Sequence, residues 1–189
     1  EDNPYFTSVD GVLYTKDKKV LVYYPCNKDE WNYTVDPSCE IIDDRAFYGC
    51  SILDDFTIPS SVTKIGECAF AYCRGLSSIV IPDSVETLAG GAFGGCESLT
   101  SAVVGNGITS MSAAESNRDE DDNTDYYRFG IFENCSKLES VVIGSKVENI
   151  GIDTFASTAL KSVDIPDSVV TVEKGAFYNC KSLEEVKIG

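Results

Sequence analysis

The sequence predicts an α/β solenoid, in which short strand-and-turn units stack side by side along one axis. An Ala-Phe-x-x-Cys segment at residues 46–50 recurs at 69–73 and at 92–96, and both steps are 23 residues. Most of the phenylalanines are followed six residues later by a leucine that opens an alternating, strand-like stretch. A unit of this size buries its apolar face only against neighbouring copies, so the repeat predicts a stacked array.

Each unit is expected to contribute one strand to a parallel ladder. In the clearest copy, Ile79 and Ile81 have a period of two, so both side chains point to one face. Pro82 has no N–H group and ends the strand, after which Val85 and Leu88 return to the core. The corresponding stretches are residues 31–39, 53–62, 76–85, 99–108, 138–147, 160–169 and 183–188.

The Ala-Phe-x-x-Cys segment is too short for a full helix and is expected to form one tight helical turn. Stacking of the units predicts that its phenylalanines line up in a column. Looser copies follow at residues 132–135, 154–155 and 176–180. One unit departs from the spacing, because Leu160 follows its phenylalanine after only five residues.

Two segments are expected: an N-terminal β-hairpin or cap at residues 1–30 and a solenoid of about six to seven units at residues 31–189. Apolar stretches on either side of residues 16–19 (Lys-Asp-Lys-Lys) indicate a hairpin turned at that point. Such a hairpin would cover the first open edge of the stack.

Residues 53–73 follow the pattern Leu-x-x-Ile-x-Ile-Pro-x-Ser-Val-x-x-Ile-Gly-x-x-Ala-Phe-x-x-Cys, with phenylalanine at the first isoleucine. This pattern resembles the BspA-like leucine-rich repeats, and the resemblance covers about residues 31–189. The asparagine ladder of commoner leucine-rich repeats is missing, and Pro59, Pro82 and Pro166 with Ser-Val pairs occupy that bend.

The resemblance implies a right-handed superhelix with a parallel β-ladder on the concave face and short helical turns on the convex face. Members of that family are mostly surface or secreted proteins of bacteria and protists. The resemblance therefore implies a cell-surface or secreted location and adhesion to host extracellular-matrix proteins, cell-surface proteins or other cells, not catalysis. Because a fold does not determine a function, this step is one of association.

Two rows of side chains are expected to face outward from the concave ladder. One row is Asn32, Asp55, Ser78, Ser101, Ser140, Ser162 and Glu185, and the next is Thr34, Thr57, Val80, Val103, Val142, Asp164 and Lys187. Three consecutive units thus expose valine beside serine, which makes Ser78, Val80, Ser101, Val103, Ser140 and Val142 the candidate partner-binding residues. The alternative is that β-branched residues are there only because they favour strands.

A 16-residue insertion within residues 112–129 interrupts the repeat spacing. Its alternating Asp119, Asp121, Asn123 and Asp125 mimic the start of a calcium loop, in which carboxylates converge on a hard cation. The glycine that should follow is Thr124 and no glutamate closes the loop, so a solvated acidic loop is the competing interpretation. No other metal site and no cofactor are expected.

Five of the eight cysteines occupy one repeat position: Cys50, Cys73, Cys96, Cys135 and Cys180. A small buried thiol fits such a tight turn, so mostly free thiols are expected. Outside this column, Cys39 is expected in the core and Cys26 is a candidate to pair with Cys39 or Cys50.

The charge and the residue types exclude several classes of function. The chain has 31 Asp and Glu against 15 Lys and Arg, a net charge of −16, which argues against a nucleic-acid partner. It has no histidine, so Ser-His-Asp and Cys-His catalysis and the usual zinc sites are excluded. No apolar run approaches the ~20 residues of a membrane span, so no membrane insertion is expected.

We expect a binding module without enzymatic activity. Two alternatives to this expectation are a hydrolase and a structural spacer. A carboxylate-based hydrolase would need a pair such as Asp55 with Glu30 or Asp54. A structural spacer within a larger surface protein needs no binding face. The strand at residues 183–188 has no polar capping unit after it, which suggests further repeats or a paired edge. Its charged side chains favour a monomer.

Overall fold

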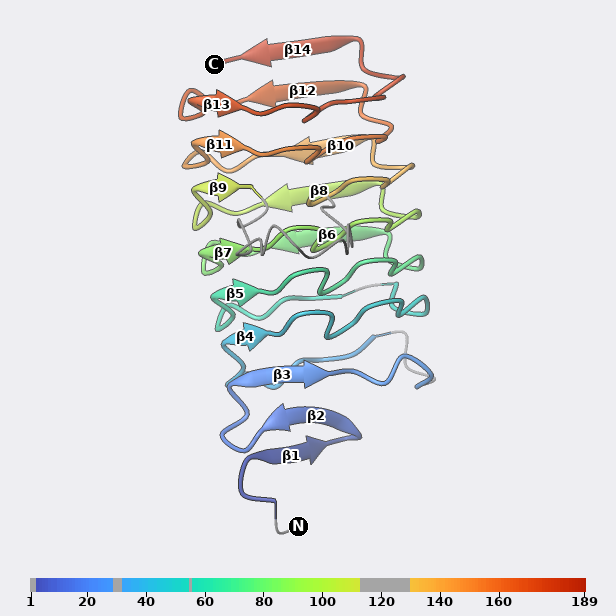
Figure 1. Cartoon of the computed structure of the whole chain (residues 1–189), viewed down its shortest axis with the longest axis vertical. Coiled ribbons are helices and arrows are strands. Elements are labelled where there is room, and N and C mark those ends of the chain that lie inside the picture. The colour runs from blue at the N-terminus through green and yellow to red at the C-terminus, as the bar shows by residue number, and fades with distance from the viewer. Residues whose placement is uncertain (1–2, 29–31, 55, 113–129) are drawn as a thin grey trace, which may run out of the picture.

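The computed structural model describes residues 3–28, 32–54, 56–112 and 130–189, and these residues form a β-solenoid (Figure 1). The units stack along the long axis, with the two chain ends at opposite ends of the stack. Within the described ranges every regular element is a β-strand, and turns connect the strands.

Three strands precede the repeats: β1 (Phe6–Val9), β2 (Val12–Thr15) and β3 (Val20–Tyr23). Each pairs antiparallel with the next, and the β2–β3 connection spans residues 16–19, where the sequence places a turn. β3 then pairs in parallel with the first repeat strand, so it joins the meander to the stack. The division into two segments at residue 30 stays a prediction.

The long strands form the ladder that the leucine-led stretches predict, and we call it the wide ladder. Its members are β6 (Ser78–Ile81), β8 (Ser101–Val104), β10 (Ser140–Val142), β12 (Ser162–Ile165) and β14 (Glu185–Ile188). Pairing is parallel and in register, so Ser78 lies opposite Ser101, which lies opposite Ser140. Since every second residue points inward, equivalent side chains of successive units form continuous rows.

A second ladder of two-residue strands follows the bend of each unit, and we call it the narrow ladder. Its members are β4 (Ile41–Ile42), β5 (Lys64–Ile65), β7 (Thr87–Leu88), β9 (Ser110–Met111), β11 (Asn149–Ile150) and β13 (Thr171–Val172). In Figure 1 these short arrows run opposite to those of the wide ladder. The sequence predicts that Leu88 returns to the core, but it does not predict a strand there.

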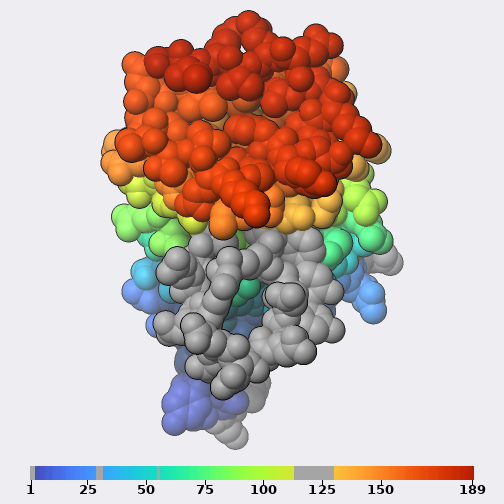
Figure 2. Space-filling model, turned by 45° about the horizontal axis from the view of Figure 1, so that its top comes forward, coloured from blue at the N-terminus to red at the C-terminus, as the bar shows by residue number. Residues whose placement is uncertain are grey.

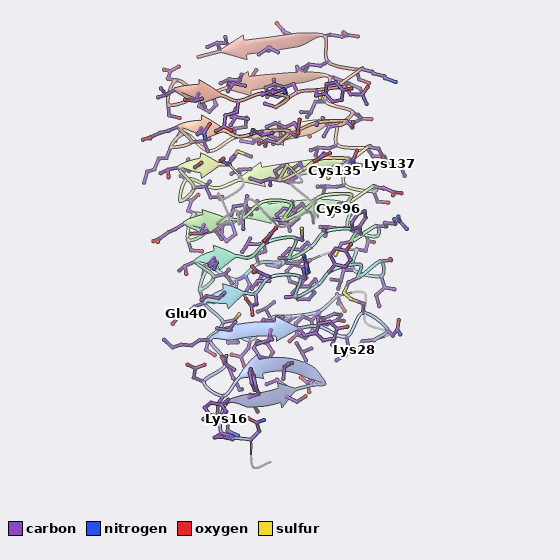
Figure 3. The ribbon with its side chains drawn as sticks, in the orientation of Figure 1. Lys16, Lys28, Glu40, Cys96, Cys135 and Lys137 are labelled. Carbon is purple, nitrogen blue, oxygen red and sulfur yellow. A yellow bond between two sulfur atoms is a disulfide. The ribbon has the colours of Figure 1, made fainter. Side chains whose placement is uncertain are left out.

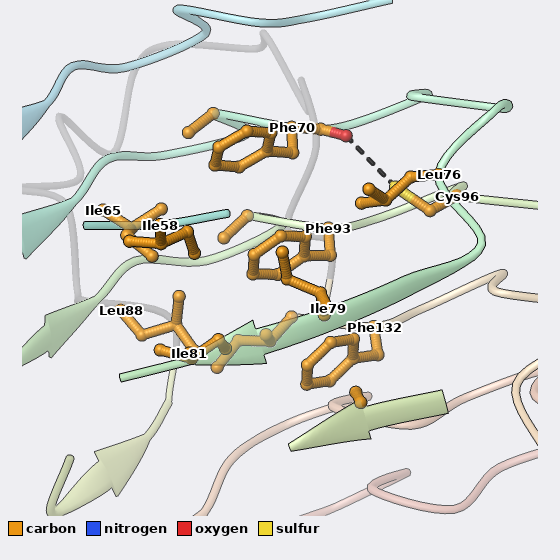
Figure 4. Close-up of a cluster of buried hydrophobic side chains, with 14 of the residues drawn as sticks. Ile58, Ile65, Phe70, Leu76, Ile79, Ile81, Leu88, Phe93, Cys96 and Phe132 are labelled. Carbon is orange, nitrogen blue, oxygen red and sulfur yellow. Dashed lines mark hydrogen bonds between the residues drawn. The ribbon is translucent and has the colours of Figure 1, made fainter. Parts of the chain in front are cut away.

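The phenylalanines stack in a column along the axis of the solenoid, as predicted (Figure 4). Successive ring centroids from Phe47 to Phe177 are 4.9, 5.2, 5.5, 5.8 and 5.5 Å apart, and the rings lie within 14° of parallel. Tyr24, whose ring centroid is 5.0 Å from that of Phe47, begins the column. Phe93 and Phe132 stack directly, so the insertion leaves the register of the column unchanged.

The short helical turns expected at the Ala-Phe-x-x-Cys segments do not appear among the described residues, which form hydrogen-bonded turns there. The amide of Phe70 donates to the carbonyl of Ala92 in the next unit. In the same way, the amide of Phe93 donates to Ile131 and that of Phe132 to Thr154. Two residues of most turns, such as Cys68 and Tyr72, have a left-handed φ of 52° and 60°. A right-handed helix cannot accommodate such residues, and its amides would have to bond within the unit.

Replacing Phe93 by alanine is expected to lower the free energy of unfolding by about 3–5 kcal/mol, because it opens a cavity between two stacked rings. Urea denaturation followed by circular dichroism measures this change. Tyr178, which is 69% exposed, is the control, and its replacement by alanine is expected to change stability by less than about 0.5 kcal/mol. Equal effects of the two substitutions would contradict the claim that the phenylalanine column stabilises the fold.

Candidate functional site

The candidate partner-binding residues lie together on one exposed face of the wide ladder. We call this surface the valine face and define it as Ser78, Val80, Ser101, Val103, Ser140 and Val142. Val80, Val103 and Val142 are 61%, 37% and 60% exposed, and they are register partners on adjacent strands. The structure therefore places these side chains in two adjacent rows, one of serine and one of valine.

The core holds the valine face in place from behind. Ile79, Ile81, Ala102 and Val104 alternate with the exposed residues and are each no more than 2% exposed. Because they pack into the same interior as the phenylalanine column, the strands cannot rotate their outward side chains without exposing apolar surface. The face is thus a preformed surface.

Charged side chains border the valine face on the C-terminal side. Lys187 Nζ lies 3.8 Å from Asp164 Oδ1 and 3.5 Å from Glu185 Oε2, and Lys161 Nζ lies 2.7 Å from Glu139 Oε2. All of these side chains are more than half exposed, so each ion pair contributes little to stability. They form a polar margin beside an apolar row.

The cysteine column has a structural role that the sequence does not reveal. The thiols of Cys73, Cys96 and Cys135 each lie 3.1 Å from the backbone carbonyl oxygen of the phenylalanine in the preceding unit. Figure 4 shows this contact between Cys96 and Phe70. A thiol is small and a weak donor, so it fits the turn and gives the phenylalanine carbonyl a second hydrogen bond, beside the one from the cysteine amide of its own unit.

One disulfide, Cys26–Cys50, joins the last turn of the cap region to the first repeat (Figure 3). Of the two partners proposed for Cys26, the structure selects Cys50, and Cys39 is a free buried thiol. The remaining thiols are also free, as expected. Burial raises the pKa of the Cys73 and Cys135 thiols well above the usual value, so they stay protonated at neutral pH and are poor nucleophiles.

Other titratable groups with a changed pKa lie where the cap meets the first unit, away from the valine face. Burial raises the pKa of both Tyr14 and Tyr33, whose hydroxyl oxygens are 2.7 Å apart. Hydrogen bonds from the hydroxyl and amide of Ser38, with that from Lys18, lower the pKa of Asp36 to about 2. These groups satisfy one another, which is the pattern of a structural network.

Several sequence candidates lie outside the described residues. Asp119, Asp121, Asn123 and Asp125 of the calcium hypothesis do so, as do Asp55 and Glu30 of the carboxylate pair. In the parts of the chain that the structure describes, no group of three or more Cys, Asp or Glu side chains is arranged to hold a metal ion. Nor does any helix long and apolar enough to cross a membrane occur there.

The fold defines the class: two parallel ladders, a column of core side chains and one unit per turn make this a leucine-rich repeat solenoid. The chain belongs to the BspA type leucine rich repeat region family, whose model matches residues 22–115 and 121–189 in six copies. No curated protein matches the chain.

Solved structures of bacterial proteins share the fold. A leucine rich cell surface protein from Faecalibacterium prausnitzii is 25% identical with a TM-score of 0.72, over 100% of this chain and 54% of that one. A T. pallidum leucine rich repeat protein is 25% identical with a TM-score of 0.75, over 99% and 82%. The pneumococcal vaccine antigen PcpA is 22% identical with a TM-score of 0.70, over 100% and 49%. This chain spans about half the length of the first and third of these.

Titration of thiols with a chromogenic reagent tests the state of the cysteines. Without reductant, the denatured chain is expected to show six thiols, and after reduction eight. In the native protein only Cys180, which is partly exposed, is expected to react quickly at about pH 8, because the other free thiols are buried. Eight thiols without reductant would contradict the disulfide, and several fast native thiols would contradict the buried column.

Proposed function

We propose that the chain is the protein-binding module of a cell-surface or secreted protein and that it captures its partner through the valine face. The observation that carries this proposal is the row of Val80, Val103 and Val142, held outward on hydrogen-bonded strands. Exposed apolar side chains on a preformed surface contribute binding free energy when a partner removes them from water, at little cost in conformational entropy. The adjacent serines supply hydrogen-bonding groups.

Two observations support a location outside the cell. The F. prausnitzii relative is described as a cell surface protein. The disulfide between Cys26 and Cys50 fits an oxidising compartment, since thiols in the cytosol are generally kept reduced. Adhesion to host extracellular-matrix proteins, cell-surface proteins or other cells is the function that we infer.

The valine face also bears on the spacer alternative. A spacer has only to hold its ends apart, so its outward positions would be satisfied by polar residues alone. Here the valine row is bordered by charged residues such as Asp164 and Lys187, which is the arrangement of an apolar patch with a polar rim. We therefore favour binding, with no catalytic step and no cofactor.

Substituting lysine at Val80, Val103 and Val142 together tests the proposal. The partner is first identified by a pull-down with the full-length protein against extracellular-matrix and host-cell surface proteins. Because three partly exposed valines lose their apolar contact and three charges must be desolvated, the variant is expected to bind about 100-fold more weakly, or roughly 3 kcal/mol. Surface plasmon resonance measures the change.

The matched control places three lysines on the narrow ladder, at the exposed positions Thr87, Ser110 and Thr171. This variant gains the same charge and keeps the valine face, so its affinity is expected to change by less than about threefold. Unchanged affinity of the valine variant, with both variants folded, would overturn the proposal.

A further inference from the structure

The wide ladder is interrupted between β10 and β12. These two strands lie side by side, yet one sheet ends at β10 and another begins at β12. Among the described residues, β6, β8 and β10 pair with one another, as do β12 and β14. The interruption falls at the C-terminal border of the valine face.

The unit that follows this interruption is the one that lacks a residue before Leu160. In four other units the amide of the leucine donates to the carbonyl of the cysteine three residues earlier: Leu76, Leu99, Leu138 and Leu183. In this unit Thr158 stands at the cysteine position. Its hydroxyl donates to the carbonyl of Phe155 in the same turn. Leu160 still reaches the core, where it is fully buried, but it does so by a shorter path. The strand that follows, β12, has no ladder pairing with β10.

A groove of about 420 Å³ lies at the interruption and crosses the ends of β10, β12 and β14. Its apolar lining consists of Val141, Val142, Ile143, Ile165, Pro166 and Ile188. Val142 belongs to both surfaces, so the groove continues the valine face. Figure 2 shows this C-terminal end of the molecule, where the last units (orange to red) form a broad open surface.

Carboxylates flank the groove. Asp164 is part of its lining and its side chain is 79% exposed. Asp167 carries its carboxylate next to Gly189, another lining residue, so closely that a side chain at this glycine would collide with it. Lys187 neutralises only part of this charge, since it is shared between Asp164 and Glu185. With a net charge of −16 on the whole chain, the groove is an apolar slot in an acidic surface.

We propose that this groove binds an extended protein segment in which an aliphatic side chain is flanked by lysine or arginine. The inference rests on the proposed binding function and names the chemistry of the partner. The aliphatic side chain fills the apolar lining, and the basic residues on either side pair with Asp164 and Asp167. The lining comes from three successive strands, so an occupant that crosses the groove contacts one strand after another, as an extended chain does.

Nuclear magnetic resonance with the isotope-labelled chain tests this inference with two blocked hexapeptides. One alternates lysine with isoleucine and the other alternates glutamate with isoleucine. Titration with the lysine peptide is expected to shift the amide signals of Val142, Ile143, Ile165 and Ile188 saturably, whereas the glutamate peptide leaves them unchanged. Equal shifts from both peptides, shifts elsewhere only, or no saturable shifts would each overturn the inference.

Three double variants separate the groove from the valine face. Asp164→Asn with Asp167→Asn is expected to weaken the lysine peptide about tenfold, because two partly exposed ion pairs are lost. Glu86→Gln with Glu148→Gln removes the same charge directly before the narrow-ladder strands β7 and β11 and is expected to change affinity less than twofold. Val80→Lys with Val103→Lys is expected to leave peptide binding intact. If the lysine peptide fails while the full partner still needs Val80 and Val103, the groove inference fails and the proposed function stands.

Discussion

Alternate turn amides of each unit donate hydrogen bonds to carbonyl groups in the following unit, and the amides between them donate within the unit. The amides of Phe70, Phe93 and Phe132 all donate forward along the axis, and each thiol of the cysteine column reaches back to the unit before. A unit on its own would leave these backbone groups unpaired and its phenylalanine ring exposed, and both are costly. Stacking pairs these backbone groups and buries the ring at the same time. It also fixes the outward rows of side chains in register, and the valine face depends on this register.

The stack tolerates a long insertion better than a short deletion. The 16-residue insertion adds chain between two stacked rings, and Phe93 and Phe132 remain 5.5 Å apart. The deletion before Leu160 removes a residue from the turn that leads into the strand, and there the wide ladder divides. Long additions to a connecting segment cost little, because the entropy of closing a loop rises slowly with its length. The groove beside the valine face is lined in part by the strand that follows the deletion.

Much of the fold could be predicted because the repeat itself encodes it. Period-two alternation at Ile79 and Ile81 gives the strand and its faces, and equal spacing of Phe47, Phe70 and Phe93 gives the column. The rest depends on partners that lie one unit away in space. The helical turn is not confirmed, because the local pattern does not reveal that alternate amides bond to the next unit or that Tyr72 takes a left-handed φ. The narrow ladder was missed because strands of two residues show no periodicity. Of the candidate site, the valine row was predictable from alternation, whereas the groove depends on how three strands pack side by side, which the sequence does not show.

Hydrogen–deuterium exchange of the turn amides tests most directly the claim that units are stable only against one another. If forward donation holds, the amides of Phe70, Phe93 and Phe132 exchange only when the stack opens as a whole, with the slowest rates of the chain, although they lie in turns. The amides of Tyr5 and Phe6, which donate to the exposed side chain of Asn3 near the N-terminal end of the stack, exchange quickly in the same experiment. Fast exchange at Phe70, Phe93 and Phe132, at the rate of ordinary turn residues, would contradict the account.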